Sequence, residues 1–217
     1  MAIQIQGNGG AIAEVDGTTW RAMRVNRKPM DYGALGSYAV TGRTGVMAAG
    51  LAANSEIFQL RWTDATRLCV ITSVHCSGGG SIVAFAAGVT IMELMIARSW
   101  TVAGSGGTAI TLTTNNQKLR SSMGTSLVND MRVASTAALT AGTKTLDAQP
   151  MGSIVSSVTA TAGTPLWPAA HLYEVTENDN HPIILAANEG IIVRATVPAT
   201  GTWTAAVDVT WMEMAAY

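Results

Sequence analysis

The C-terminal stretch, residues 188–217, constrains the fold of this chain more than any other part. Every second residue is apolar along two arms, at 191–197 and 203–211. Within each arm, the residues that alternate with these apolar ones are mostly Thr, Arg and Asp. Alternation of period two, with β-branched and aromatic residues, is typical of strands that bury one face. Between the arms, Pro198 presets a turn and Gly201 allows a positive φ. We therefore predict a β-hairpin with one face in a core.

The register of this hairpin depends on the length of its turn. A loop over residues 198–201 would place the inward Val197 opposite the outward Thr202. Such a slip is costly because side chains alternate between the two faces of a strand. We therefore expect a connection of about five residues, or a bulge at Gly201 that restores the parity.

Further strand patterns recur at regular spacing from residue 56 onward. Residues 57–63 and 67–76 are separated by a short turn that begins at Asp64, and we predict that they form another hairpin. Residues 81–103 carry both helical and extended spacings, and the glycines that flank them favour a strand. About eight to ten strands with frequent turns predict an all-β, antiparallel β-sandwich, with a jelly roll as the leading topology.

Residues 1–54 differ from the rest and are predicted to form an extended N-terminal arm, with the β-sandwich domain at 55–217. The segment is rich in turn residues, has poor apolar periodicity, and holds five basic residues against three acidic ones. Aromatic and Arg side chains are common anchors of interfaces. We therefore expect this segment to contact neighbouring subunits through Trp20, Arg21, Arg24, Arg27 and Tyr32. The alternative is that it folds back onto its own domain as an edge strand.

Charged residues make up only 12% of the 217 residues, which is about half of their usual share in a soluble protein. A lone monomer with so few charges would expose much small-residue and apolar surface. We therefore expect a homo-oligomer or larger assembly whose subunits cover one another. An ordinary β protein coated with Thr and Ser is the alternative. The net charge of −1 gives no sign of a nucleic-acid partner.

Two further sequence features concern localisation. The N-terminus lacks the basic and long apolar regions of a signal peptide, so we expect synthesis in a cytoplasm. Apolar runs are too short to cross a bilayer, which needs about 18 residues or more, so we expect no membrane partner.

The two cysteines, Cys69 and Cys76, lie in one predicted strand. Seven residues of strand cover about 23 Å and place the two side chains on opposite faces. A disulfide requires Cα atoms within about 7 Å of each other. We therefore predict two free thiols with a structural role.

The sequence contains no recognisable catalytic arrangement. A nucleophile needs a base within reach, usually His, yet His75 and Cys76 are strand neighbours whose side chains point to opposite faces. The acidic loop at 177–180 lacks the regular spacing of a calcium loop. We expect no metal, no cofactor and no enzymatic activity.

Tryptophan is the residue type most suited to stacking on a sugar ring. Trp62, Trp203 and Trp211 share strand faces with aliphatic residues, so we assign them to the core. Trp20 and Trp167 are then the surface candidates for a glycan site.

The chain resembles β-sandwich virion proteins of tailed bacteriophages in two runs. The first, residues 181–214, resembles their C-terminal hairpin and reads HPIILAANEGIIVRATVPATGTWTAAVDVTWMEM. The second, residues 97–124, reads ARSWTVAGSGGTAITLTTNNQKLRSSMG. The resemblance covers about residues 56–217 and implies a structural protein of the particle, such as a head decoration or cement protein, a shell protein or a tail component. It transfers no site residue to this chain.

The resemblance and the low charge together favour a capsid decoration or cement protein that stabilises the shell through subunit contacts. Its partners would be copies of itself and the major capsid protein, and it would reside in the virion after synthesis in the host bacterial cytoplasm. The alternative is a receptor- or glycan-binding β-sandwich module of a virion, a tail or head adhesin, with a glycan as its partner.

Overall fold

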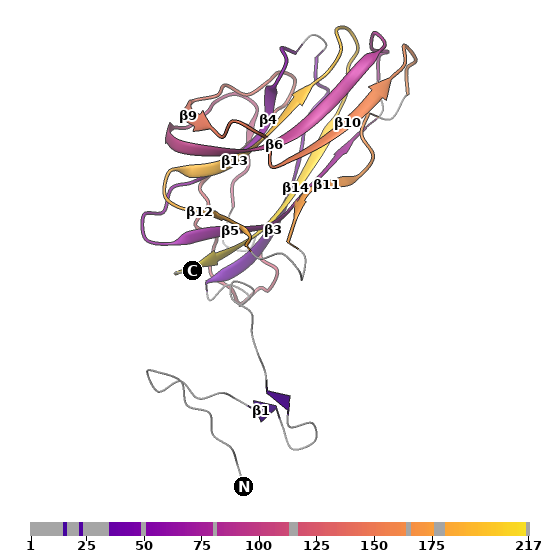
Figure 1. Cartoon of the computed structure of the whole chain (residues 1–217). Coiled ribbons are helices and arrows are strands. Elements are labelled where there is room, and N and C mark those ends of the chain that lie inside the picture. Colours follow the sequence, from indigo (N-terminus) through magenta and orange to yellow (C-terminus); the bar gives the residue numbers. More distant parts are fainter. Residues whose placement is uncertain are drawn as a thin grey trace. The chain divides into compact units, whose positions relative to one another are not determined.

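The computed structural model describes residues 15–16, 22–23, 35–48, 51–79, 82–112, 117–163, 166–175 and 181–215. The chain divides into two compact units, Met1–Asp31 and Tyr32–Tyr217. In the first unit, β1 (Val15–Asp16) pairs antiparallel with β2 (Ala22–Met23). The second unit consists of two antiparallel sheets packed face to face (Figure 1).

These sheets have five and seven strands. The five-stranded sheet contains, in spatial order, β11 (Ala170–Glu174), β5 (Leu68–Gly78), β14 (Ala205–Met214) and β3 (Gly36–Arg43), with β12 (Ile183–Leu185) also paired to β5. The seven-stranded sheet contains β10 (Gly152–Val158), β6 (Gly88–Val102), β13 (Glu189–Thr196), β4 (Ser55–Trp62), β8 (Asp130–Val133) and β7 (Thr108–Ala109), with β9 (Thr143–Leu146) also paired to β6. No helix occurs among the described residues, and the predicted all-β antiparallel sandwich is confirmed.

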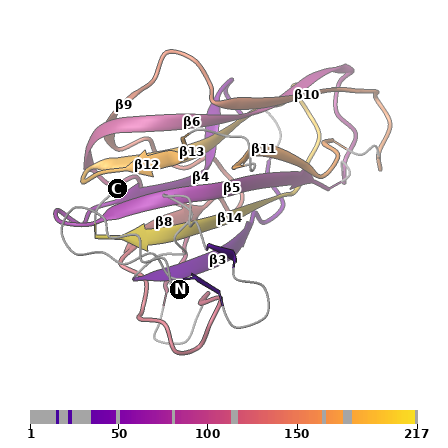
Figure 2. The ribbon, with the colours of Figure 1, turned by 60° about the horizontal axis from the view of Figure 1, so that its bottom comes forward.

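Eight of these strands have a jelly-roll-like order. One sheet contains the row β3-β14-β5-β11, and the other contains the row β4-β13-β6-β10. Strands that follow one another in the chain, such as β3, β4, β5 and β6, therefore alternate between the two layers (Figure 2). Two interleaved Greek keys of this kind make up a jelly roll.

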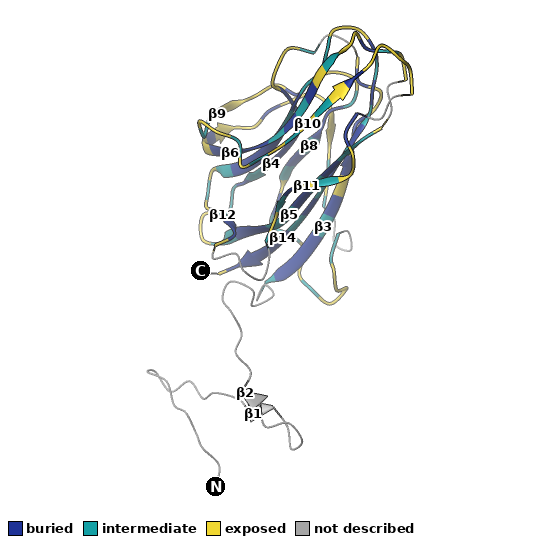
Figure 3. Ribbon diagram, turned by 45° about the vertical axis from the view of Figure 1, so that its right-hand side comes forward, coloured by how far each residue is buried: buried dark blue, intermediate teal, exposed yellow. Residues whose placement is uncertain are grey.

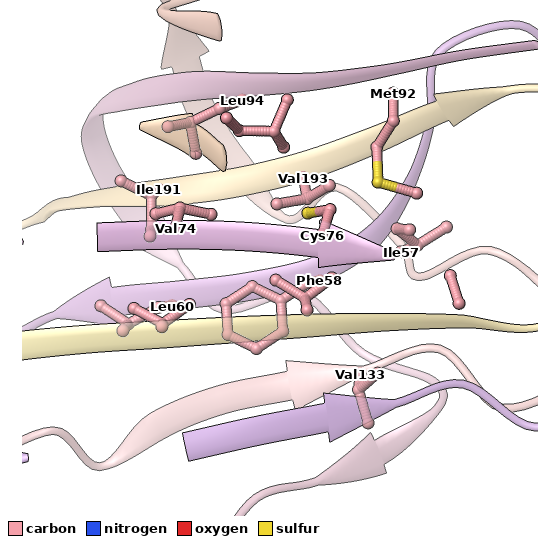
Figure 4. Close-up of a cluster of buried hydrophobic side chains, with 14 of the residues drawn as sticks. Ile57, Phe58, Leu60, Val74, Cys76, Met92, Leu94, Val133, Ile191 and Val193 are labelled. Carbon is pink, nitrogen blue, oxygen red and sulfur yellow. The ribbon is translucent and has the colours of Figure 1, made fainter. Parts of the chain in front are cut away.

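The core lies between the sheets and is formed by side chains that alternate inward along the strands. Ile191 and Val193 of β13 and Val207 of β14 are fully buried. Figure 4 shows part of this cluster, which also includes Val74 and Cys76 of β5. The predicted inward faces of residues 191–197 and 203–211 are thus confirmed.

The two predicted hairpins are wrong, because their strands face each other across the core. β4 and β5 belong to different sheets, and so do β13 and β14. The connections at residues 63–67 and 197–204 are therefore arches from one sheet to the other. Inward alternation is satisfied equally by two strands that pair in one sheet and by two that pack across a sandwich. The pattern predicted the strands and their faces, but it could not predict their partners.

Both arches use the turn residues that the sequence indicates. The Asp64 carboxylate accepts hydrogen bonds from the backbone N–H groups of Thr66 and Arg67, both at 2.8 Å. Gly201 has a φ of 86°, in the left-handed region that favours glycine. The turn chemistry is compatible with an arch as well as with a hairpin, so it did not distinguish the two.

The expected arm boundary at residue 54 is wrong for residues 36–43. β3 pairs with β14 from Arg43 to Gly36, so this segment is an edge strand of the sandwich. Its buried positions are Tyr38 and Val40, but also Gly36, Ser37 and Gly42. Because glycine has no side chain to mark an inward position, the strand shows little apolar alternation in the sequence.

A bulge in β5 brings both cysteines to the core. The register of β5 against β14 shifts at Thr72, which has no directly opposed residue. The extra residue reverses the parity of the strand, and Cys69 and Cys76 are both fully buried in the same cluster. The predicted free thiols are confirmed, whereas their predicted placement on opposite faces is wrong.

The chain between β6 and β10 covers part of the outer face of the seven-stranded sheet. Nζ of Lys144, on β9, lies 2.8 Å from Oε2 of Glu56 on β4 and 4.4 Å from the centre of the Trp100 ring. Gln59 donates a hydrogen bond to the same carboxylate oxygen at 2.6 Å. The Lys144 side chain is only 2% exposed, so a buried ion pair joins β9 to β4.

Candidate interaction surfaces

Five of the exposed large apolar side chains fall into two groups. The arch-end group consists of Val46, Ile82 and Val83, next to residues 202–203. The β10 group consists of Val89 on β6 and Val155 on β10, which are 53% and 63% exposed. The register of β6 against β10 places these two residues on the same outer face, one diagonal step apart. Grouped apolar side chains in solvent are typical of contact sites between proteins.

A groove of about 640 Å³ lies at the end of the five-stranded sheet that adjoins the arch-end group. Among the described residues that line it, Arg43, at the end of β3, is the charged one. The other lining residues are Gly, Ala, Ser and Thr, including Ser77 and Thr204. The described wall of the groove therefore offers small side chains, hydroxyl groups and the positive charge of Arg43.

A row of polar side chains crosses the outer face of the five-stranded sheet. The strand register places Thr41, Asp208, His75 and His171 opposite one another on β3, β14, β5 and β11. Thr41 donates to Oδ1 of Asp208 at 2.5 Å, and Nδ1 of His75 lies 3.0 Å from Oδ2. Because a carboxylate only accepts hydrogen bonds, Nδ1 of His75 carries the proton. The rings of His75 and His171 meet edge to face, with centres 5.1 Å apart.

Hydrogen bonds join Thr41, Asp208 and His75 of this row, and a ring contact joins His75 to His171. Glu174 extends the row, because its Oε2 lies 3.7 Å from Nε2 of His171. In the part of the chain that the structure describes, no three His, Cys, Asp or Glu side chains are placed to hold one metal ion. The arrangement therefore links four strands on the outer face of their sheet.

His75 and Cys76 point to opposite faces of β5, as predicted. His75 belongs to the outer row, whereas Cys76 is fully buried in the core. Burial raises the pKa of the Cys76 thiol well above its usual range, and the charge of Asp208 adds to this effect. A thiol that stays protonated in the core is not a nucleophile.

The five residues expected to form the interface lie outside the described residues. They are Trp20, Arg21, Arg24, Arg27 and Tyr32. The same is true of the acidic loop at 177–180, since the described chain stops at residue 175 and resumes at 181. These expectations therefore stay predictions.

The expectation that Trp167 lies on the surface is wrong. Its side chain is buried and meets the ring of Trp203 edge to face, with centres 5.3 Å apart. The indole lies against Gly78, where a Cβ atom would come within 2.3 Å of the ring. The prolines around Trp167 predicted a surface bend, but the sequence gives no signal that a glycine on β5 leaves space for the ring.

Comparison with known protein families, with curated proteins and with solved structures finds no match to this chain. A search of the described residues finds no helix that could span a membrane.

Proposed function

We propose that this protein is a structural component of a phage particle, a capsid decoration or cement protein that stabilises the shell through subunit contacts. The observation that carries the proposal is the nature of the exterior. Charged residues make up only 12% of the chain, and both the β10 group and the arch-end group stand in solvent. Surfaces of this kind are usually covered by other subunits. The resemblance of residues 181–214 to phage virion proteins supports the same assignment.

The architecture is compatible with this role. Jelly rolls occur in viral capsid proteins, and also in lectins and cupins, so the fold by itself leaves several functions open. The tryptophans favour the assembly role over the glycan-binding alternative. Each tryptophan of the described residues is buried, and a buried indole offers no platform on which a sugar could stack.

In this proposal the N-terminal segment binds neighbouring subunits or the major capsid protein. Substituting Trp20, Arg21, Arg24 and Arg27 by Ala in the full chain should abolish incorporation into particles and leave the sandwich folded. The matched control is Arg120→Ala, which removes an exposed Arg of the sandwich and should leave incorporation unchanged. Equal incorporation of all three proteins would contradict the role assigned to this segment.

The deciding experiment is the copy number of the protein in purified virions, measured by quantitative mass spectrometry relative to the main shell protein. A decoration protein occurs in a fixed ratio close to that of the shell protein, whereas a tail adhesin occurs in a few copies. Absence of the protein from purified particles would overturn the proposal.

A further inference from the structure

The two rows of strands in the sandwich have four end strands, and three of them are protected against pairing with another chain. The edge of β3 is covered by a loop, since Ala39 N–H donates to the Gln117 carbonyl and Leu119 N–H to that of Ser37, both at 3.0 Å. β7 is only two residues long. β11 has a register shift after His171, and its His171 and Glu174 side chains are about half exposed. Covering loops, short strands, bulges and charges are the usual means of blocking an edge.

The fourth end strand, β10, has none of these features. Gly152–Val158 pairs residue for residue with β6 and has no register shift. Its sequence, GSIVSSV, contains no charged residue and no proline. Among the described residues, no backbone hydrogen bond links 152–158 to a segment other than β6. Figure 3 shows β10 at the margin of its sheet, with exposed positions along the strand.

Access to β10 is best around its centre. At Gly152 the strand lies against β11, because a Cβ atom there would be 1.8 Å from the Leu172 carbonyl oxygen. Val155, the middle residue, is 63% exposed. A second strand could therefore pair along residues 153–157 without displacing β11.

We propose that β10 pairs antiparallel with β10 of a second copy of this chain, about a two-fold axis at Val155. In this register Val155 lies opposite Val155 of the partner subunit, and Ser153 lies opposite Ser157 of the partner subunit. In an isologous interface the same surface of each subunit contacts itself, so that surface must be self-complementary. The proposed pairing meets this condition because the side chains that face each other are small or apolar, and neutral. Like charges, which destabilise directly opposed pairs, do not occur in it.

The pairing also covers exposed apolar surface. Val89 and Val155 of each copy share the outer face, so the two β10 groups join into one strip across the axis. The two seven-stranded sheets become one continuous sheet. This inference deepens the proposed function and rests on its premise that copies of the chain pack together. The dimer is tested on purified protein without shells. Dimerisation can therefore fail while shell binding holds, and shell binding can fail while dimerisation holds.

The first test is a symmetric crosslink. Opposed residues of antiparallel strands have Cα atoms about 4.5–5.5 Å apart, within the range of a disulfide. Oxidised Val155→Cys should therefore form a covalent dimer. The matched control is Ser153→Cys, which is exposed on the same strand but would lie about 14 Å from its own copy in this register. Cys69 and Cys76 are buried and should not compete.

Mixing Ser153→Cys with Ser157→Cys checks the register, because these positions are opposed and should crosslink. Crosslinking of Ser153→Cys alone as readily as Val155→Cys would overturn the register. Failure of Val155→Cys to crosslink would overturn the pairing.

The second test is the mass of the full chain in solution by sedimentation velocity. Wild type should dimerise, while Val155→Lys and Val155→Asp should each be monomeric because like charges meet at the axis. An equimolar mixture of the two variants should regain the dimer, which excludes misfolding as the cause. Leu119→Lys, at an exposed apolar position on the loop beside β3, should stay dimeric. A monomeric wild type, or an oligomer insensitive to both charged variants, would overturn the proposal.

Discussion

At the scale of single residues, Glu213 combines burial with ionisability. Its side chain lies near the end of β14 and is 1% exposed. It accepts hydrogen bonds from Ser126 Oγ at 2.6 Å, Leu127 N–H at 3.0 Å and Trp211 Nε1 at 3.2 Å. Burial raises the pKa of the Glu213 carboxyl, and these hydrogen bonds offset part of the rise. Burial, with a contribution from Glu213, also raises the pKa of Tyr38 to about 12.

The raised pKa of Glu213 makes stability depend on pH. As pH rises above the usual range of a Glu side chain, the unfolded chain releases this proton before the folded chain does. The stability that the protonated Glu213 contributes is therefore fully present below the usual pKa range of Glu. It is lost as pH rises through the pKa of Glu213 in the folded state. Glu213→Gln keeps an acceptor oxygen and removes the titration. Urea titrations give the free energy of unfolding of each protein. The value for wild type minus the value for Glu213→Gln should decrease from pH 4 to pH 8. A constant or increasing difference would contradict this explanation.

At the scale of elements, the arches determine which strands become neighbours. β4 and β13 pair in one sheet, and β5 and β14, which follow them in the chain, pair in the other. Two antiparallel pairs of strands are thus stacked across the core and joined by arches at opposite ends. The strands can exchange no backbone hydrogen bonds across the core, so the inward side chains and the arches specify this arrangement.

The ion pair between β9 and β4 provides a prediction at this scale. Lys144→Met should destabilise the protein by about 3 kcal/mol, because it leaves the Glu56 carboxylate buried without its cation. The double variant Lys144→Met/Glu56→Gln should recover part of this loss. The measurement is the free energy of unfolding in urea.

The control for this prediction is an ion pair in solvent. Arg98 contacts Asp147 and Glu189, and its side chain is 44% exposed. Arg98→Met should therefore cost less than about 1 kcal/mol, as is usual for exposed pairs. A loss for Lys144→Met no larger than that for Arg98→Met would show that burial does not strengthen the pair.

At the scale of the whole molecule, the sandwich begins earlier than the composition indicates. The unit boundary lies between Asp31 and Tyr32, and β3 is part of the five-stranded sheet. Tyr38 on β3 is buried and stacks on Trp211, with ring centres 5.5 Å apart. Residues 36–43 therefore contribute to the core of the domain.

Two truncations should separate these parts of the chain. Deleting residues 1–31 should change the free energy of unfolding by less than about 1 kcal/mol, because every strand of the sandwich is retained. Deleting residues 1–48 should cost at least about 3 kcal/mol, because it removes β3 and leaves a cavity at Tyr38. Equal losses for the two truncations would contradict the boundary.

The all-β class, the buried faces of β13 and β14 and the free thiols could be predicted from the amino-acid sequence, because they depend on the local alternation of side chains and on the reach of a strand. The partners of each strand, the inclusion of β3 in the sandwich and the burial of Trp167 became clear from the three-dimensional fold. Pairing in one sheet and packing across a sandwich bury the same alternating face. Glycines at inward positions of β3 and at Gly78 contribute by the space they leave, which no pattern of apolar residues can indicate. The open edge of β10 became recognisable in the same way, once the structure showed how the other three end strands are protected.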